Sequence, residues 1–128
     1  MKKLKGYIFS RNFMGERVPQ HVQNIVIRNY CTINNYEYLL SATEYAMPDS
    51  SLVLNQTIIE CKNYDGIVAY SLFQLPEKKR ERLKIVEYIT NQKKELHFAV
   101  ESRKIYTYQE YQEIEMMWQV RQVIDSNI

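Results

Sequence analysis

Two hydrophobic patterns alternate along this chain. Short continuous apolar runs are typical of strands buried on both faces of a parallel sheet, whereas apolar residues at three- and four-residue steps are typical of amphipathic helices. The runs predict strands at residues 5–10, 37–42, 67–70 and 96–100. The spaced segments predict helices at residues 18–34, 51–63, 76–91 and 107–124.

This alternation predicts a single three-layer α/β domain that spans residues 1–128. Its sheet should be mostly parallel and four-stranded, in the order 2-1-3-4. Helix one is expected on the face opposite helices two and three, or partly sharing a face with the terminal helix. Because crossover connections are right-handed, the loops after the strands should meet at one edge of the sheet. Ligands of open α/β sheets bind at that edge.

Apolar spacing also predicts which side of each helix is buried. In helix one the inner positions are expected to be Val22, Ile25, Val26, Asn29 or Tyr30, and Ile33. In helix two they are expected to be Leu54, Ile58 and Cys61, with N-cap oxygens from Asp49, Ser50 or Ser51. Pro19 suits the start of helix one, where its missing N–H costs nothing. The mixed-sign run at residues 77–82 is predicted to be a solvated helix face.

The last predicted helix is apolar over more than one core-facing stripe. Its apolar set comprises Tyr111, Ile114, Met116, Met117, Trp118, Val120, Val123 and Ile124. A second buried contact would explain this width. We therefore expect a homo-oligomer that forms through helix 107–124.

Candidate chemistry lies directly after the predicted strands. Ser10 ends strand one and is a candidate nucleophile, provided that a base or a cation activates it. Arg11 and Arg17 flank the start of helix one and form a candidate site for phosphate or carboxylate. His21 lies in the first helical turn, where the positive helix end favours a neutral imidazole. Glu44 follows strand two and is a second candidate for proton transfer.

Further polar residues at the same edge are candidates for ligand binding. They are Gln20, Gln23, Ser71, Gln74 and Glu101. All of these candidates also fit plainer roles as loop, cap or surface residues, and His97 inside strand four fits a core histidine. No glycine-rich phosphate loop, metal-binding spacing or GxSxG elbow occurs, so no metal and no cofactor are expected.

Composition adds a few exclusions. Apolar residues make up 45% and charged residues 25% of the chain, which is ordinary for a folded domain. No stretch approaches the ~20 apolar residues of a membrane span, and no signal peptide is visible. We therefore expect a cytoplasmic protein with no membrane partner, in which Cys31 and Cys61 are reduced thiols.

Two stretches resemble the catalytic domain of serine recombinases, the resolvases and invertases. GYIFSR, residues 6–11, ends a strand in a serine, and Gln23 follows in the next helix, as in that family. GIVAYSLFQLPE, residues 66–77, resembles the third strand and the motif aspartate-arginine-leucine-x-arginine that follows it. The resemblance implies a resolvase- or flavodoxin-like fold. Gln74 and Glu77 stand where the family has arginines that stabilise the scissile phosphate. Their loss and a net charge of only +2 predict no DNA cleavage and no nucleic-acid partner.

Three strings resemble the sporadic carbohydrate cluster proteins, small bacterial proteins encoded among surface-polysaccharide genes. They are GYIFSRNFMGERVPQHVQN, LLSATEYAMP and VAYSLFQLP, and they cover about a third of the chain. The resemblance implies an enzyme or accessory protein of carbohydrate biosynthesis that acts on a phosphorylated or nucleotide-linked sugar. Arg11 and Arg17 would then hold the anion, while His21 and Glu44 would move protons. The alternatives are a recombinase-like domain without DNA cleavage and a non-catalytic oligomeric scaffold.

Overall fold

The computed structural model describes residues 1–47 and 50–126. Their strands form one sheet in the order β2-β1-β3-β4-β5. The strands are β1 (Lys3–Phe9), β2 (Glu37–Glu44), β3 (Gly66–Ala69), β4 (Glu95–Phe98) and β5 (Arg103–Ile105). The helices are α1 (Gln20–Ile33), α2 (Leu52–Ile59), α3 (Lys79–Asn91) and α4 (Tyr108–Ser126), with short 3-10 helices at Cys61–Asn63 and Leu72–Gln74.

The predicted parallel order is confirmed, and one strand is added to it. β1 pairs in parallel with both β2 and β3, and β3 pairs in parallel with β4. β5 pairs antiparallel with β4, placing Ile105 opposite Leu96. The sequence pattern predicts no strand between residues 100 and 107. Only Ile105 of β5 is buried, so the strand has too little apolar pattern to be recognised from the sequence.

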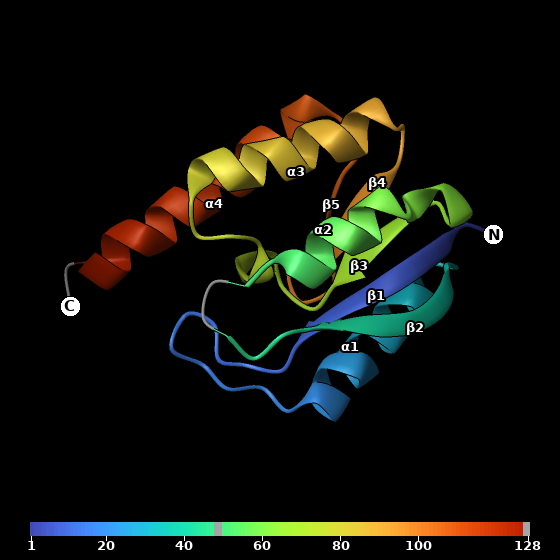
Figure 1. Ribbon diagram of the computed structural model, residues 1–128, viewed down its shortest axis with the longest axis horizontal. Coiled ribbons are helices and arrows are strands. Elements are labelled where there is room, and N and C mark those ends of the chain that lie inside the picture. Colours follow the sequence, from blue (N-terminus) through green and yellow to red (C-terminus); the bar gives the residue numbers. More distant parts are fainter. Residues whose placement is uncertain (48–49, 127–128) are drawn as a thin grey trace.

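Alternating side chains of the strands build a core on each face of the sheet. On one face, Leu4, Ile8 and Val68 pack with Ile27 and Cys31 of α1. On the other, α2, α3 and α4 share a larger core with the intervening strand residues. Figure 1 shows α1 behind the strands and α2 in front of them. Helix one thus lies opposite helices two and three, as predicted, and the terminal helix packs on the α3 side.

The buried side of α1 matches the predicted one only in part: Val26 and Tyr30 are half-buried and pack against the core, as expected. Its buried residues are Gln23, Ile27 and Cys31, which are spaced four apart. Ile25 and Ile33 are instead 62% and 68% exposed. The apolar spacing does not show this face because its first buried residue is Gln23, whose amide hydrogen-bonds to the backbone. The stripe predicted for helix two is confirmed, since Leu54 and Ile58 of α2 and Cys61 of the 3-10 helix that follows are all buried.

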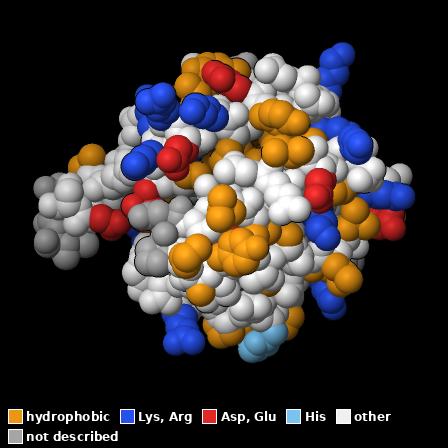
Figure 2. Space-filling model, in the orientation of Figure 1, with side chains coloured by type: hydrophobic (Ala, Val, Ile, Leu, Met, Phe, Trp, Pro, Cys, Tyr) orange, Lys and Arg blue, Asp and Glu red, His pale blue; other side chains and the backbone are white. Residues whose placement is uncertain are grey.

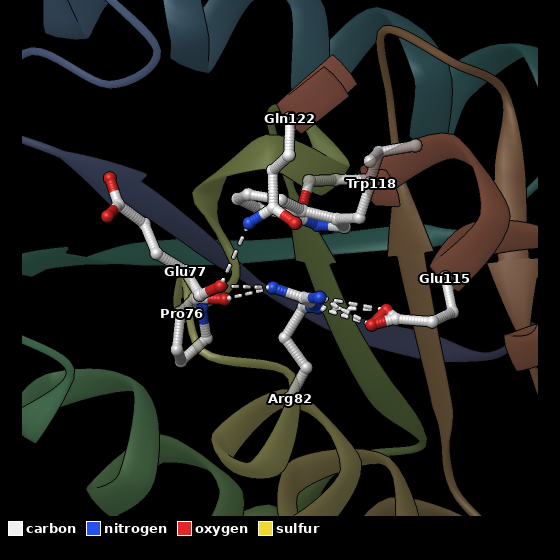
Figure 3. A network of polar contacts seen from close by, with 7 residues as sticks. Pro76, Glu77, Arg82, Glu115, Trp118 and Gln122 are labelled. Carbon is white, nitrogen blue, oxygen red and sulfur yellow. Dashed lines mark hydrogen bonds and ion pairs between the residues drawn. The ribbon is translucent and has the colours of Figure 1, made fainter. Parts of the chain in front are cut away.

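One residue of the charged run at 77–82 is buried. Arg82 is 1% exposed, so the prediction of a solvated face is wrong at this position. Its guanidinium forms a double ion pair with Glu115 of α4 and lies 4.4 Å from the centre of the Trp118 ring. It also donates to the carbonyls of residues 76 and 77, at 3.0 and 2.6 Å (Figure 3). The charge is tolerated inside because these partners satisfy it.

The terminal helix α4 runs past the end of the sheet (Figure 1). Its inner face buries Tyr111, Ile114 and Trp118. Further along, exposed apolar side chains remain: Met116, Val120, Val123 and Ile124 are 67%, 54%, 59% and 52% exposed. Neither α4 nor any other helix in the described part of the chain has the length and hydropathy needed to cross a membrane.

Candidate functional site

A cavity of about 550 Å³ opens where the loops after β1, β2 and β3 meet. Its size falls within the ~300–1,000 Å³ of pockets that enclose small ligands. The loop after β1 contributes residues 11–15, the loop after β2 contributes Ala46, Ser50 and Ser51, and the chain after β3 contributes residues 73–78 and Glu81. Of the predicted site residues, Arg11 and Gln74 line this cavity.

Ser10 and Arg11 tie the end of β1 to the end of β2. The Ser10 hydroxyl donates to the backbone carbonyl of Glu44 at 2.7 Å. The Arg11 guanidinium donates to the carbonyl of Tyr45 at 3.1 Å and lies 4.1 Å from the centre of the Phe9 ring. Ser10 itself is not among the residues that line the cavity.

Glu44 is buried and is held by several donors. Its carboxylate accepts from the Tyr7 hydroxyl at 2.8 Å, the Ser50 hydroxyl at 2.9 Å, and the N–H groups of Val53 and Leu54 at 3.1 Å each. Burial alone would raise the pKa of Glu44, but these hydrogen bonds outweigh burial and hold the pKa below its usual range. The arrangement favours a structural group that is ionised at neutral pH over a group that carries protons.

The same carboxylate caps the N-terminus of α2. Val53 and Leu54 lie in the first turn of that helix, whose N–H groups have no partner within the helix. A negative charge is also favoured at this end. Among the expected capping residues, Ser51 makes no such side-chain bond and Asp49 lies outside the described residues.

Gln23 and Gln74 use their amides to join neighbouring segments. The Gln23 side chain accepts from the Phe9 N–H at 2.9 Å and donates to the carbonyls of Phe9 at 3.0 Å and Val18 at 2.9 Å. Gln74 donates to the Gln23 amide oxygen at 2.9 Å. Its own oxygen accepts from the N–H groups of residues 70 and 71, at 3.1 and 3.3 Å. Both side chains are buried, and their polar atoms are occupied by the protein.

Ser71 and Glu101 join the loops after β3 and β4. The Ser71 hydroxyl donates to one Glu101 oxygen at 2.8 Å, and the Leu72 N–H donates to the other at 2.9 Å. The Ser71 oxygen also accepts from the Phe73 N–H at 3.2 Å. Neither Ser71 nor Glu101 lines the cavity.

Three predicted residues lie apart from the cavity. Arg17, Gln20 and His21 are exposed, and none of them lines the cavity wall. The loop before them turns back on itself: Phe13 and Glu16 exchange backbone hydrogen bonds of 3.0 and 2.9 Å. This turn places the preceding residues at the cavity and carries the start of α1 away from it. The structure therefore does not bring Arg17 and His21 together with Ser10, Glu44 and Gln74 in one pocket.

The cavity contains residues that sequence reasoning missed. They include the aromatic rings of Phe13 and Phe73 and the charged residues Glu77, Lys78 and Glu81. The last three lie on the connection from β3 to α3 and the first turn of α3, after the 3-10 helix Leu72–Gln74, at the edge where ligands were expected. The mixed-sign run that contains them predicted a solvated helix face and no binding site. Their position after a strand was the available signal.

Side chains of α4 hydrogen-bond to backbone carbonyls in and beside the cavity walls. Trp118 donates to the carbonyl of Leu72 at 3.0 Å, and Arg121 donates to the carbonyl of Met14 at 3.3 Å. Gln122 donates to the carbonyl of Glu77 at 3.2 Å, beside the bond from Arg82 (Figure 3).

His97 has the core role predicted for it. It is fully buried between Glu95, at 2.8 Å, and the Tyr30 hydroxyl, at 2.6 Å. Burial lowers the pKa of His97, although Glu95 acts in the opposite direction. Among residues 1–47 and 50–126, no group of three or more His, Cys, Asp or Glu side chains could hold a metal ion.

Comparison with known proteins gives matches of fold. No family model and no curated protein matches the chain. The N-terminal catalytic domain of TP901-1 integrase matches with a TM-score of 0.65 and 16% identity, over 95% of this chain and 94% of that domain. A resolvase family site-specific recombinase from Streptococcus pneumoniae matches with a TM-score of 0.63 and 12% identity, over 97% and 89%.

These matches confirm the resolvase-like α/β fold. They give no support to the resemblance to sporadic carbohydrate cluster proteins. They also overturn our expectation that nucleic acid is excluded as a partner, because both matching proteins are recombination enzymes. Net charge and two missing arginines were too narrow a basis for that exclusion, since binding depends on where the charges lie.

Proposed function

We propose that this chain is a serine-recombinase-like domain that binds nucleic acid without cleaving it. The fold and the position of Ser10 at the end of β1 support the first part. The observation that carries the second part, binding without cleavage, is the burial of Gln74. Where the resemblance places a phosphate-binding arginine, this residue is an uncharged amide held by Gln23 and the backbone.

Cleavage of a phosphodiester needs positive charge around the phosphate and an activated hydroxyl. Glu77, at the second arginine position, adds negative charge instead. Arg82 is neutralised by Glu115 and buried. The Ser10 hydroxyl donates to the carbonyl of Glu44, and a carbonyl that accepts this bond is no general base. These features support binding without strand cleavage.

Exposed cations near the cavity support binding. Lys78, Lys79 and Arg80 are all exposed, and Figure 2 shows Lys and Arg side chains gathered over the start of α3. Arg11 lines the same cavity as Lys78. Contacts from such cations to phosphates supply affinity that does not depend on sequence.

Fluorescence anisotropy with labelled oligonucleotides, over a series of salt concentrations, tests the binding. Replacing Lys78, Lys79 and Arg80 by Gln should weaken binding at least tenfold. It should also reduce the slope of the logarithm of the binding constant against the logarithm of the salt concentration by up to ~3. The matched control replaces Lys62, Lys93 and Lys94 by Gln, which removes the same charge from loops at the opposite edge of the sheet. Equal losses in the two variants would contradict a binding face at α3.

Incubation with a nicked duplex that traps covalent intermediates tests the absence of cleavage. We expect no adduct on Ser10 in the natural chain. Gln74→Arg should not create one, because the longer charged side chain would lose the buried partners of Gln74. A covalent Ser10 adduct in the natural chain would contradict the proposal, and so would failure to bind any nucleic acid.

The exposed apolar residues of α4 support self-association as part of this function. Met116, Val120, Val123 and Ile124 lie on a helix that runs past the sheet, and each is more than half exposed. A second copy would bury them.

A further inference from the structure

We infer that the cavity takes one unpaired nucleotide of a nucleic-acid strand, with the base inside and the phosphate at the mouth. This inference rests on the proposed function and narrows it. The expected ligand is a nucleic-acid strand with unpaired bases, and duplex DNA should bind weakly.

The walls suit a flat aromatic ligand. Phe13 and Phe73 come from different loops, and Met14 and Leu75 also line the cavity. Phe13 and Leu75 are mostly buried in the core, so Phe73 is the more exposed of the two rings. Phe73 is partly exposed. Trp118 contacts its ring edge to face, with ring centres 5.2 Å apart, and the Arg121 guanidinium lies over the ring, 5.2 Å from its centre. Aromatic side chains of this kind bind unpaired bases of any sequence by stacking.

The charges suit a nucleotide better than a simple anion. Arg11 and Lys78 offer positive charge, but Glu77 and Glu81 offset it on the same wall. A bare phosphate would meet both signs at once. A nucleotide uses them separately, since cations bind its phosphate and carboxylates accept from the exocyclic amino group of a base. This mixture favours cytosine, adenine or guanine over thymine.

These groups are available for a ligand. No hydrogen bond or ion pair with another described residue engages the side chains of Glu77, Lys78 or Glu81. The wall that carries them is also held in place, because Arg82 and Gln122 bind the carbonyl of Glu77 (Figure 3). A wall fixed before binding lowers the entropy cost of capturing a ligand.

A paired base cannot enter such a cavity. Its faces are covered by neighbouring bases, and taking it out of the stack costs a few kcal/mol. A single strand offers its bases without this cost. The inference therefore predicts a preference that the cationic surface alone would not give.

Anisotropy titrations with single-stranded oligodeoxycytidine, single-stranded oligothymidine and a duplex of equal length test the inference. We expect the cytidine strand to bind at least tenfold more tightly than the duplex and several-fold more tightly than the thymidine strand. Arg11→Gln, Lys78→Gln and Phe73→Leu should each weaken binding of the cytidine strand several-fold or more. Lys93→Gln is the charge control and should leave it unchanged.

The outcomes separate this inference from the proposed function. Duplex binding as tight as strand binding, or strand binding indifferent to Arg11, Lys78 and Phe73, would overturn the cavity assignment and leave nucleic-acid binding intact. Failure to bind strand and duplex alike would overturn both. If Phe73→Leu does not fold by circular dichroism, the variants at Arg11 and Lys78 decide the question.

Discussion

Glu44 connects two strands and a helix through a single carboxylate. Tyr7 reaches it from β1, it stands at the end of β2, and Val53 and Leu54 approach it from α2. A buried charge is costly unless hydrogen bonds compensate it. Here five donors do so, because the Ser50 hydroxyl and the Tyr45 N–H also bond the carboxylate, and the result is a fixed junction beneath the cavity edge.

Glu44→Gln is expected to lower the free energy of unfolding by about 2 kcal/mol near neutral pH, because the amide NH2 faces donors that need an acceptor. The folded-state pKa of Glu44 lies below the ordinary value of about 4.3. Its stabilisation is therefore complete above about pH 4.3 and is lost as the pH falls through the folded-state pKa. Urea unfolding at several pH values should show the difference from the natural chain shrinking in acid.

The matched control for this prediction is Glu37→Gln. Glu37 is exposed at the start of the same strand, β2, so the substitution should leave stability unchanged at every pH. A deficit of Glu44→Gln that stays constant from neutral to acidic pH would contradict the assignment of Glu44 as a cap that is ionised at neutral pH and protonated in acid.

At the scale of elements, α3 and α4 are joined by a buried ion pair rather than by apolar contacts alone. Arg82 and Glu115 are 1% and 5% exposed. The desolvation cost of such a pair can equal its attraction, so its presence is weak evidence for stability. Removing one partner is different, because the other charge then remains buried without compensation.

We expect Arg82→Met and Glu115→Leu each to lower the free energy of unfolding by about 3 kcal/mol. The double variant should lose clearly less than the sum of the two, because it leaves no unpaired charge. Urea unfolding of the four proteins gives this double-mutant cycle. The exposed pair of Arg103 and Glu113 is the control, and its coupling should be below about 1 kcal/mol. Additive losses of stability at Arg82 and Glu115 would contradict a coupled ion pair between α3 and α4.

At the scale of the whole molecule, the parts predicted from sequence are those whose burial is apolar. The four parallel strands, their order and the buried stripe of helix two follow from hydrophobic runs and spacing, whereas the antiparallel β5 does not. Gln23, Glu44 and Arg82 were not recognised as buried, because a polar residue is buried only when partners far along the chain satisfy it. The cavity was misjudged for a related reason. The turn at Phe13 and Glu16 follows no hydrophobic period, and beyond it Arg17 and His21 are exposed and do not line the cavity.

The outer half of α4 carries several exposed apolar side chains on one helix, and we propose that a second copy covers them. Val120→Lys with Val123→Lys should abolish self-association, since charges would replace side chains that are 54% and 59% exposed. Stability of the single chain should hardly change, because neither residue belongs to its core. Sedimentation velocity over a concentration series measures the association. Ile25→Lys, at an equally exposed position on α1, is the control and should still associate. A natural chain that sediments as a monomer at all concentrations, or a control that dissociates like the α4 variant, would rule out this interface.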